Sequence, residues 1–489
     1  MNLNACDRLF RLALIPLAAV VLVATGCTSS MSTATQSSAV TGSTFVVGTD
    51  APAPFASVVS FQVQVESVQL VPAGGGTPVS MISGTPTVDF ARYNGLQTLL
   101  DMNDVPVGQY GSVIITLNST GTIGYLVTGA GAPTISTMPA TISPASVTVT
   151  LNRTLNVVNG GSPVGLRVDF DLAQSIGVTN GAINGNVDPA FDVRTVARTD
   201  TGAYIDELAG GVVSVDQTAQ SFVISGPHGE NFTINTNGQT EWDGAASLST
   251  LTTSSIVQVS GQLDPADQTL DADEVAVLTD SRFYATGQIT YVNPPPPATG
   301  AASSFDLYVR ALEPADISGS TGMPISLGQI AQVNLTGSEK YDIYWMHNPL
   351  TQFLFNSSAL VAGQDVAIGG PDTGITAGTP GLTVNRIHLR NWGFNGTVVA
   401  SSQSSANGTF RMTVNGFAGL LIPETITVYL GPRCDFRYGF GAFDDLANAT
   451  SIRVVGLLLK NPANGNVVLI ARHVDGRDFT DFTTAAWQQ

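Results

Sequence analysis

The C-terminal part of the chain repeats one pattern of short, strand-like segments three times. The three units are residues 205–280, 283–392 and 393–478. Each opens on a glycine-led strand, continues with a Ser/Thr-Phe strand and an apolar strand closing on glycine, and ends on an alternating strand. About five short strands per unit are enough for a small barrel, and repetition indicates that one supersecondary unit recurs. The second unit is enlarged by insertions.

The composition also favours strands. Charged residues make up only 11% of the chain, and 51 glycines and 26 prolines supply frequent turns. Val59–Val65 alternates apolar with polar residues, as in a half-buried strand, whereas Leu96–Leu100 is expected to form a helical turn. The sequence predicts an all-β chain: an independently folding, β-sandwich-like domain over residues 43–198, then three related small β-barrel or oligonucleotide/oligosaccharide-binding (OB)-like repeats. Residues 479–489 form a tail.

Residues 1–26 have the parts of an export signal. Arg8 and Arg11 supply a positive start, and the apolar segment Leu12–Val23 is too short to span a bilayer. It ends at Ala24-Thr25-Gly26-Cys27, which resembles the bacterial lipobox, with Ala24 in place of the usual leucine. The resemblance implies cleavage before Cys27 and lipid on its thiol. Residues 27–42 are then a lipoprotein's Ser/Thr-rich tether.

Lipidation makes the membrane the first predicted partner, because several acyl chains anchor a protein stably. The expected location is the cell envelope. Thr28, directly after the cysteine, indicates the outer membrane if the bacterium has two membranes. The alternative is an ordinary secretory signal with a chance cysteine.

Four segments in the first domain occur in a characteristic order. They are Asp50-Ala51-Pro52, the alternating strand Phe61–Val68, the segment Val105–Tyr110, and Val187-Asp188-Pro189. In this order they resemble a bacterial family known as domain of unknown function 4382, over about residues 43–195. The resemblance implies a β-sandwich and an exported location, and it brings no known activity.

The first repeat has a second resemblance. Gly210–Leu278 contains a glycine-led strand, an aromatic strand, a Val-x-Val-x-Gly-type strand and a closing strand. This order is similar to that of domain of unknown function 5666, which also carries no established activity. The second and third repeats diverge further from it.

Several function classes are disfavoured. The net charge of −18 argues against nucleic acid as a partner, because phosphate binding needs a basic patch. The sequence has no Gly-x-Ser-x-Gly or His-Glu-x-x-His motif. Its four histidines, His228, His347, His388 and His473, lack metal-ligand spacing, and sheet packing or exposure explains them. The sequence therefore indicates no catalytic residue and no cofactor.

Three groups of reactive side chains have competing explanations. Asp264, Asp267, Asp271 and Asp273 crowd one hairpin, where they bind calcium or, more commonly, form a charged turn. Asp169 and Asp171 share one strand face, as an acid/base pair or a solvated face. Cys434 lies beside Arg433 and Arg437, which would lower its pKa, but an inert thiol is the simpler interpretation.

The richest aromatic segment lies in the second repeat. Tyr341, Tyr344 and Trp345 form a candidate ligand-binding platform for sugar rings, and the competing interpretation is a hydrophobic core. The sequence predicts an anchored envelope protein without catalytic activity, binding or structural, whose partner is a glycan or another envelope protein. The alternatives are a dedicated glycan-binding module and a hydrolase with an unrecognised active site.

Overall fold

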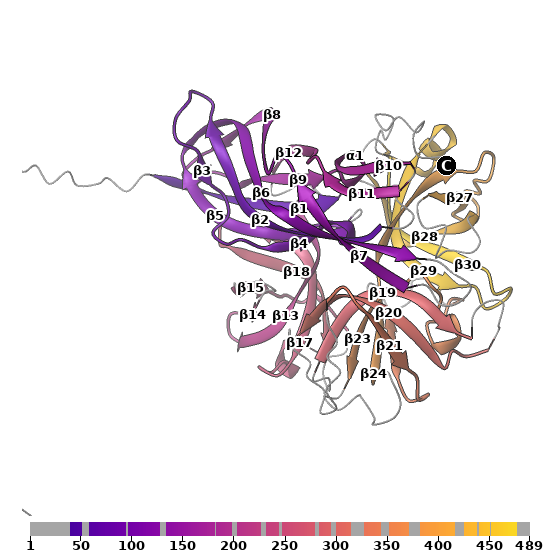
Figure 1. The fold of residues 1–489 in the computed structure, drawn as a ribbon. Helices are drawn as coiled ribbons and strands as arrows, with labels where there is room; N and C mark the ends of the chain where they lie inside the picture. Colours follow the sequence, from indigo (N-terminus) through magenta and orange to yellow (C-terminus); the bar gives the residue numbers. More distant parts are fainter. Residues whose placement is uncertain are drawn as a thin grey trace, which may run out of the picture. The chain divides into compact units, whose positions relative to one another are not determined.

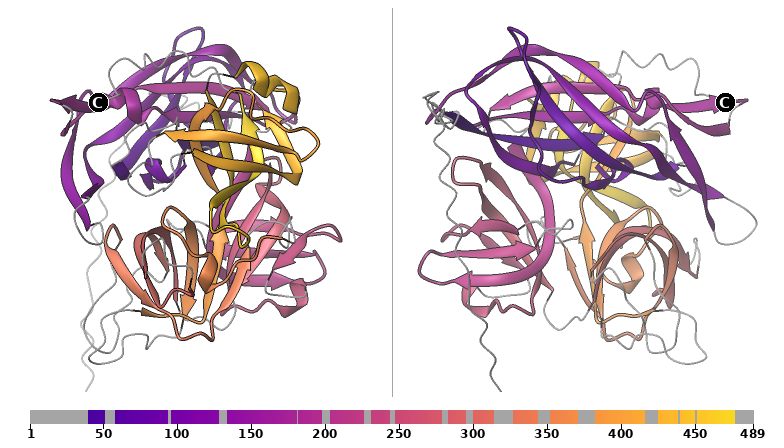
Figure 2. Two further views of the ribbon diagram at one scale, coloured as in Figure 1. Left: turned by 90° about the vertical axis from the view of Figure 1, so that its right-hand side faces the viewer. Right: turned by 60° about the vertical axis from the view of Figure 1, so that its left-hand side comes forward.

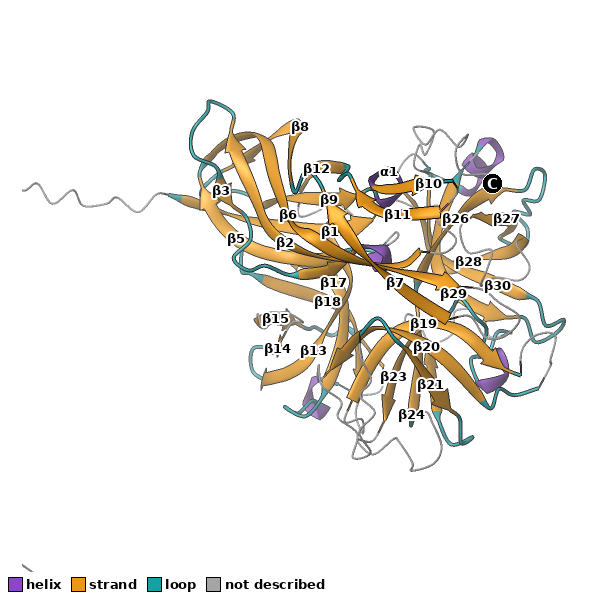
Figure 3. Cartoon of the chain, in the orientation of Figure 1, coloured by secondary structure: helices purple, strands orange, loops and turns teal. Residues whose placement is uncertain are grey.

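Strands form most of the chain in a computed structural model, and helix is confined to short turns (Figures 1 and 3). The structure describes residues 40–50, 58–93, 96–127, 134–180, 182–197, 203–225, 231–243, 247–278, 283–294, 300–313, 327–343, 352–370, 382–415, 425–437, 440–449 and 451–476. The prediction of an all-β chain is confirmed.

The first domain consists of two packed sheets, here called the sandwich. Its smaller sheet has the order β12-β9-β1-β5. These strands are β1 (Thr41–Asp50), β5 (Thr98–Pro106), β9 (Val164–Phe170) and β12 (Phe191–Ala197). The larger sheet contains β2 (Val58–Pro72), β3 (Val79–Ser80), β4 (Thr87–Asp89), β6 (Gly108–Val127), β7 (Thr134–Ile142), β8 (Ser146–Val157), β10 (Ile176–Thr179) and β11 (Ala182–Val187). Two one-turn helices complete it: η1 (Phe90–Tyr93) and α1 (Leu172–Ser175).

Side-chain alternation explains the sandwich. Along β2, buried residues alternate with more exposed ones over much of the strand, as expected for a strand with one face in a core. Phe61 of β2 meets Phe170 of β9 edge-on, with ring centroids 5.3 Å apart, so the two sheets share one core. The helical turn expected at Leu96–Leu100 is wrong, because β5 begins at Thr98 and pairs there with Gly48 of β1. The one-turn helix lies earlier, at η1.

Three β-units follow the sandwich. The first barrel contains β13 (Tyr204–Asp216), β14 (Ser221–Ser225), β15 (Asn231–Asn235), β16 (Glu241–Asp243), β17 (Ile256–Asp264) and β18 (Thr269–Leu278). The second repeat contains β19 (Phe283–Asn293), β20 (Ser304–Glu313), β21 (Ile330–Asn334), β22 (Lys340–Ile343), β23 (Asp365–Gly370), β24 (Leu382–Thr383) and β25 (Arg386–Arg390). The third barrel contains β26 (Trp392–Val398), β27 (Thr409–Asn415), β28 (Thr425–Arg437), β29 (Ile452–Lys460) and β30 (Val467–Asp475).

All three units use the same strand pairings. In the third barrel the closed order is β26-β27-β28-β30-β29, with β28 and β30 parallel (Figure 2). The first barrel closes in the same way, through the parallel pair β15–β18. In the second repeat the closing strand is divided into β24, which pairs with β21, and β25, which pairs with β23. In each unit a short 3-10 helix precedes the strand that pairs with the unit's first strand: η3 (Leu248–Thr250) before β17, η4 (Ser357–Ala359) before β23 and η5 (Phe443–Asn448) before β29. These are small Greek-key β-units of the OB type.

A glycine recurs in the first strand of each unit because no side chain fits there. A Cβ on Gly287 would lie 1.8 Å from the carbonyl oxygen of Tyr308 on the neighbouring strand. A Cβ on Gly210 would lie 2.0 Å from the carbonyl oxygen of Ser225, and a Cβ on Gly396 would lie 2.1 Å from that of Thr413. The glycine in the first strand of each unit therefore marks a close approach to the backbone of the neighbouring strand.

The sandwich and the first barrel share apolar side chains. Phe45, Val47 and Leu99 of the sandwich belong to the same buried cluster as Phe222 and Val259 of the first barrel. Residues 40–489 accordingly form one compact unit. These side chains of the sandwich are buried with the barrel in place, and the independent folding expected from the sequence stays a prediction.

Residues 40–198 expressed alone should consequently be less stable than the same strands in the full chain. Burying each of these apolar side chains is worth about 1.5–3 kcal/mol, and the fragment leaves them in water. Hydrogen exchange in β2 and β6 should therefore be faster in the fragment. Equal exchange rates in the two proteins would show that the shared cluster contributes nothing to the stability of the sandwich.

Candidate binding cavity

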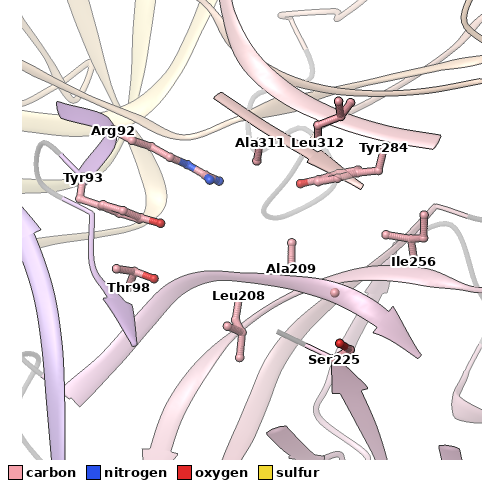
Figure 4. A pocket seen from close by; sticks show the side chains of 11 residues that line it. Arg92, Tyr93, Thr98, Leu208, Ala209, Ser225, Ile256, Tyr284, Ala311 and Leu312 are labelled. Atoms are coloured by element: carbon pink, nitrogen blue, oxygen red, sulfur yellow. The ribbon is translucent and has the colours of Figure 1, made fainter. Parts of the chain in front are cut away.

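A cavity of about 80 Å³ lies where the sandwich, the first barrel and the second repeat meet (Figure 4). Its polar lining comes from Arg92, Tyr93, Thr98, Ser225 and Tyr284. Its apolar lining comes from Leu208, Ala209, Ile256, Ala311 and Leu312, and the backbone of Gly210 completes it. Small-molecule sites typically combine such an apolar wall with a few convergent polar groups.

Four separate elements, η1, β5, β14 and β19, bring the polar groups together. Arg92 and Tyr93 end the one-turn helix η1, directly after β4. Tyr284 lies near the start of β19, and its ring is 2% exposed. The Tyr284 hydroxyl is 3.4 Å from Oε1 of Gln258 on β17, a long hydrogen bond to a residue of the first barrel. Figure 4 shows the Arg92 side chain extending toward the cavity between the phenol groups of Tyr93 and Tyr284.

Buried charges surround the cavity. Asp365 begins β23 and Arg390 ends β25, and their side chains form an ion pair of 3.1 Å with both residues at most 2% exposed. The Arg310 guanidinium lies over the Trp392 ring, 4.5 Å from its centroid. Asp89 accepts a hydrogen bond of 2.8 Å from the backbone N–H of Phe61. Buried charges are tolerated when they are paired in this way.

Burial shifts the titration of these groups. It raises the pKa of Asp365 to about 7, although Arg310 and Arg92 act in the opposite direction. It also raises the pKa of Asp89, again against the two arginines. Burial raises the pKa of the Tyr284 phenol, so that this group keeps its proton and remains a hydrogen-bond donor at neutral pH.

Two further buried Arg–Asp pairs connect strands elsewhere. Arg453 of β29 and Asp475 of β30 are directly opposed, 3.0 Å apart and each 1% exposed. Arg472 of the third barrel is 3.3 Å from Asp206 of the first barrel. These pairs join strands or units, and their carboxylates are already bound by guanidinium groups.

The comparison with known families concerns the sandwich. Residues 41–186 match the family model described as Domain of unknown function (DUF4382). This confirms the resemblance read from the first domain. No curated protein matches the chain. The region that matches this family model thus supplies Arg92, Tyr93 and Thr98 to the cavity, and the two units after the sandwich supply the remainder.

The paired aspartates of the sandwich do not lie on a solvated face, so that interpretation is wrong. Asp169 is 1% exposed and lies 3.4 Å from Arg167. Asp171 is 7% exposed, and its carboxylate caps α1 by accepting a hydrogen bond of 2.9 Å from the N–H of Gln174. Burial raises the pKa of Asp171 to about 6. Both residues have structural partners.

The calcium candidates are held by local contacts. Asp264 accepts a hydrogen bond from the N–H of Ala266, and Asp271 accepts one from the side chain of Asn235. Within the part of the chain that the structure describes, no cluster of three or more His, Cys, Asp or Glu side chains is suited to hold a metal ion. The structure does not bring Asp267 and Asp273 into such a cluster.

Cys434 and His388 are both held in their neutral forms. Burial and the adjacent Asp435 raise the pKa of the Cys434 thiol to about 12, although Arg437 opposes them. The lowered pKa suggested by the flanking arginines is therefore wrong. Burial, together with Arg386, lowers the pKa of His388 to about 3, so its imidazole is uncharged at neutral pH. His388 is 1% exposed, which agrees with a packing role.

The aromatic platform is described only in part. Tyr341 lies in β22, is partly buried, and meets Phe355 edge-on with ring centroids 5.6 Å apart. Phe355 belongs to the hydrophobic core of the second repeat, so Tyr341 packs at the edge of that core. Tyr344 and Trp345 lie outside the described residues, as do Cys27, His228 and His347. Their predicted roles stay predictions.

The residues of the cavity were not singled out by any sequence motif. Arg92 and Tyr284 are separated by almost two hundred positions, and no local pattern connects them. One signal was available, because the chain has only 19 lysines and arginines. Arg310, Arg390 and Arg453 interrupt apolar strands, and a charged residue in such a strand indicates a buried partner.

Proposed function

We propose that this chain is a lipid-anchored protein of the bacterial cell envelope that binds a small ligand and does not catalyse a reaction. The observation that carries the binding role is the cavity, because it combines an arginine and two tyrosines with an apolar wall. The buried carboxylates near it have partners within the fold, since Asp365 pairs with Arg390 and Asp89 accepts a hydrogen bond from the backbone N–H of Phe61, which favours a structural role for them over acid/base chemistry.

The anchor is supported by the leader. Its positive start, short apolar segment and Ala24-Thr25-Gly26-Cys27 ending fit a lipoprotein signal, and Ser/Thr-rich residues follow. Among the residues with described positions, no helix is long and apolar enough to cross a bilayer. We place the protein in the cell envelope, at the outer membrane where one exists.

The first barrel supports a further family assignment. Gly210–Leu278 has the strand order expected from the resemblance to domain of unknown function 5666, and it folds into a closed five-stranded unit. We include that membership in the proposal. A glycan or an envelope protein as a second, surface-bound partner stays a prediction from the sequence.

Replacing Cys27 with serine should abolish lipidation and release the protein from membranes, since the thioether-forming thiol is lost. Metabolic labelling with a fatty-acid analogue, followed by membrane fractionation, measures both effects. Cys434→Ser is the matched control and should keep full labelling. Label that persists in Cys27→Ser, or a wild-type chain that never acquires label, would contradict the anchor.

A further inference from the structure

The polar groups of the cavity are hydrogen-bond donors. Arg92 presents a guanidinium, which has only donors and suits the oxygens of a carboxylate or phosphate group. The phenols of Tyr93 and Tyr284 lie on either side of it (Figure 4). Burial keeps the Tyr284 phenol protonated. Together these groups favour a ligand that is rich in acceptors, toward which the Tyr284 hydroxyl would turn from its long hydrogen bond of 3.4 Å to Gln258.

The charge balance around the cavity also favours an anion. The interacting charged groups that surround it are the guanidinium groups of Arg92, Arg310 and Arg390 and the carboxylates of Asp89 and Asp365. Burial lowers the pKa of Arg390 and raises the pKa values of Asp89 and Asp365, which reduces the charge on all three groups. Against the effect of its own burial, Tyr93 and Asp365 raise the pKa of Arg92, so the arginine that lines the cavity keeps its positive charge. Charge–charge attraction is strengthened in a partly buried site, where the effective dielectric constant is about 20 or less.

The size of the cavity limits the ligand to a small molecule. Its volume of about 80 Å³ is roughly half of the ~150 Å³ of an apolar cavity that holds benzene. A carboxylate on a short chain, or a single phosphate or sulfate, fits this space, and a sugar ring does not. The apolar side chains Leu208, Ile256 and Leu312 provide contact for a short hydrocarbon part.

From these three features we propose that the cavity binds a small oxoanion, with Arg92 as the charged anchor and Tyr93 and Tyr284 as flanking donors. The inference rests on the proposed binding function and specifies its ligand class. The ligand is a free phosphate-like ion or the carboxylate of a small metabolite, because each presents two oxygens that a guanidinium binds through two parallel hydrogen bonds.

The test uses the full chain purified in detergent, titrated with acetate, inorganic phosphate and sulfate at constant ionic strength set by sodium chloride. Calorimetry and thermal unfolding are recorded together, because a ligand that binds only the folded state raises its melting temperature saturably. At least one of the three anions should bind and stabilise. Comparing them distinguishes the carboxylate from the phosphate-like source.

Arg92→Gln should weaken that binding by about tenfold or more, since hydrogen bonds to charged groups are worth about 1.5–3 kcal/mol. Tyr284→Phe keeps the ring packing and should weaken binding by about twofold to tenfold, as expected for one neutral hydrogen bond. It also keeps the test decisive if Arg92→Gln does not fold. Arg194→Gln, on a side chain of the sandwich that is 47% exposed, is the matched control and should bind as the wild type does.

Stabilisation by chloride equal to that by the three anions would overturn the proposal, as would binding unchanged in both Arg92→Gln and Tyr284→Phe. Failure here is separable from failure of the anchor. A chain that is labelled at Cys27 and ignores all three anions loses this inference alone. A chain that binds an anion and is never labelled loses the anchor alone.

Discussion

Asp475→Asn is expected to lower the free energy of unfolding by about 3–5 kcal/mol, because it leaves the guanidinium of Arg453 buried without its carboxylate. Both side chains are 1% exposed, and the Nε of Arg453 lies 3.0 Å from the carboxylate of Asp475. The measurement is the shift of the urea denaturation midpoint of the full chain. Few single substitutions in this protein should cost more.

The matched control is an exposed pair of the same kind. Asp192 and Arg194 lie 2.8 Å apart, but both are 47% exposed, so Asp192→Asn should cost about 0–1 kcal/mol. Replacing Arg453 and Asp475 together with leucine should cost less than Asp475→Asn alone, because no buried charge then remains. Equal costs for the buried and exposed pairs would show that Arg453 does not depend on its partner.

Lowering the pH should destabilise the wild-type protein more than it destabilises the His388→Gln variant. Burial holds the pKa of His388 at about 3 in the folded chain, below its usual 6.5. Between these values the unfolded chain binds a proton that the folded chain does not, so stability falls as the pH falls from 6.5 toward 3. The wild type should lose about 2 kcal/mol more than the variant between pH 7 and pH 5.

The readout is the difference between the pH profiles of unfolding free energy for the two proteins. Groups with raised pKa values act with the opposite sign. Asp171, with a pKa of about 6, takes up its proton in the folded state first, so its contribution to stability declines as the pH rises toward 6. Such groups are present in both proteins and cancel in the difference. Parallel profiles would show that His388 becomes protonated without unfolding.

Local pattern was sufficient to predict the strands and the repeats. Alternation in β2 and the recurring glycines near Gly287 and Gly396 depend on neighbouring residues and adjacent strands. Alternation also suggests that one face of β25 is polar and exposed. In the structure Arg386, His388 and Arg390 are all buried, because that face packs against other parts of the chain. One sequence does not reveal such a non-local contact.

The same reason explains why the cavity could not be predicted. Its residues come from η1 and β5 of the sandwich, from β13, β14 and β17 of the first barrel, and from β19 and β20 of the second repeat, so they belong to three different folded units. Asp169 and Asp171 were misjudged for a related reason. Polar residues at alternate positions of a strand normally face solvent, but Asp169 pairs with Arg167 and Asp171 caps the N-terminus of α1. Tyr341 packs edge-on against Phe355, which belongs to the core of the second repeat.

The buried Arg–Asp pairs constrain how this chain can evolve. In the second repeat the acid lies on β23 and the arginine on β25, whereas in the third barrel the arginine lies on β29 and the acid on β30. Either polarity is compatible with the fold, but a lone charge is not. Exchange from one polarity to the other requires two mutations, and each single mutant is poorly stable. Descendants of a common repeat would therefore change both positions together or neither, so that selection acts on the pair as one inherited character.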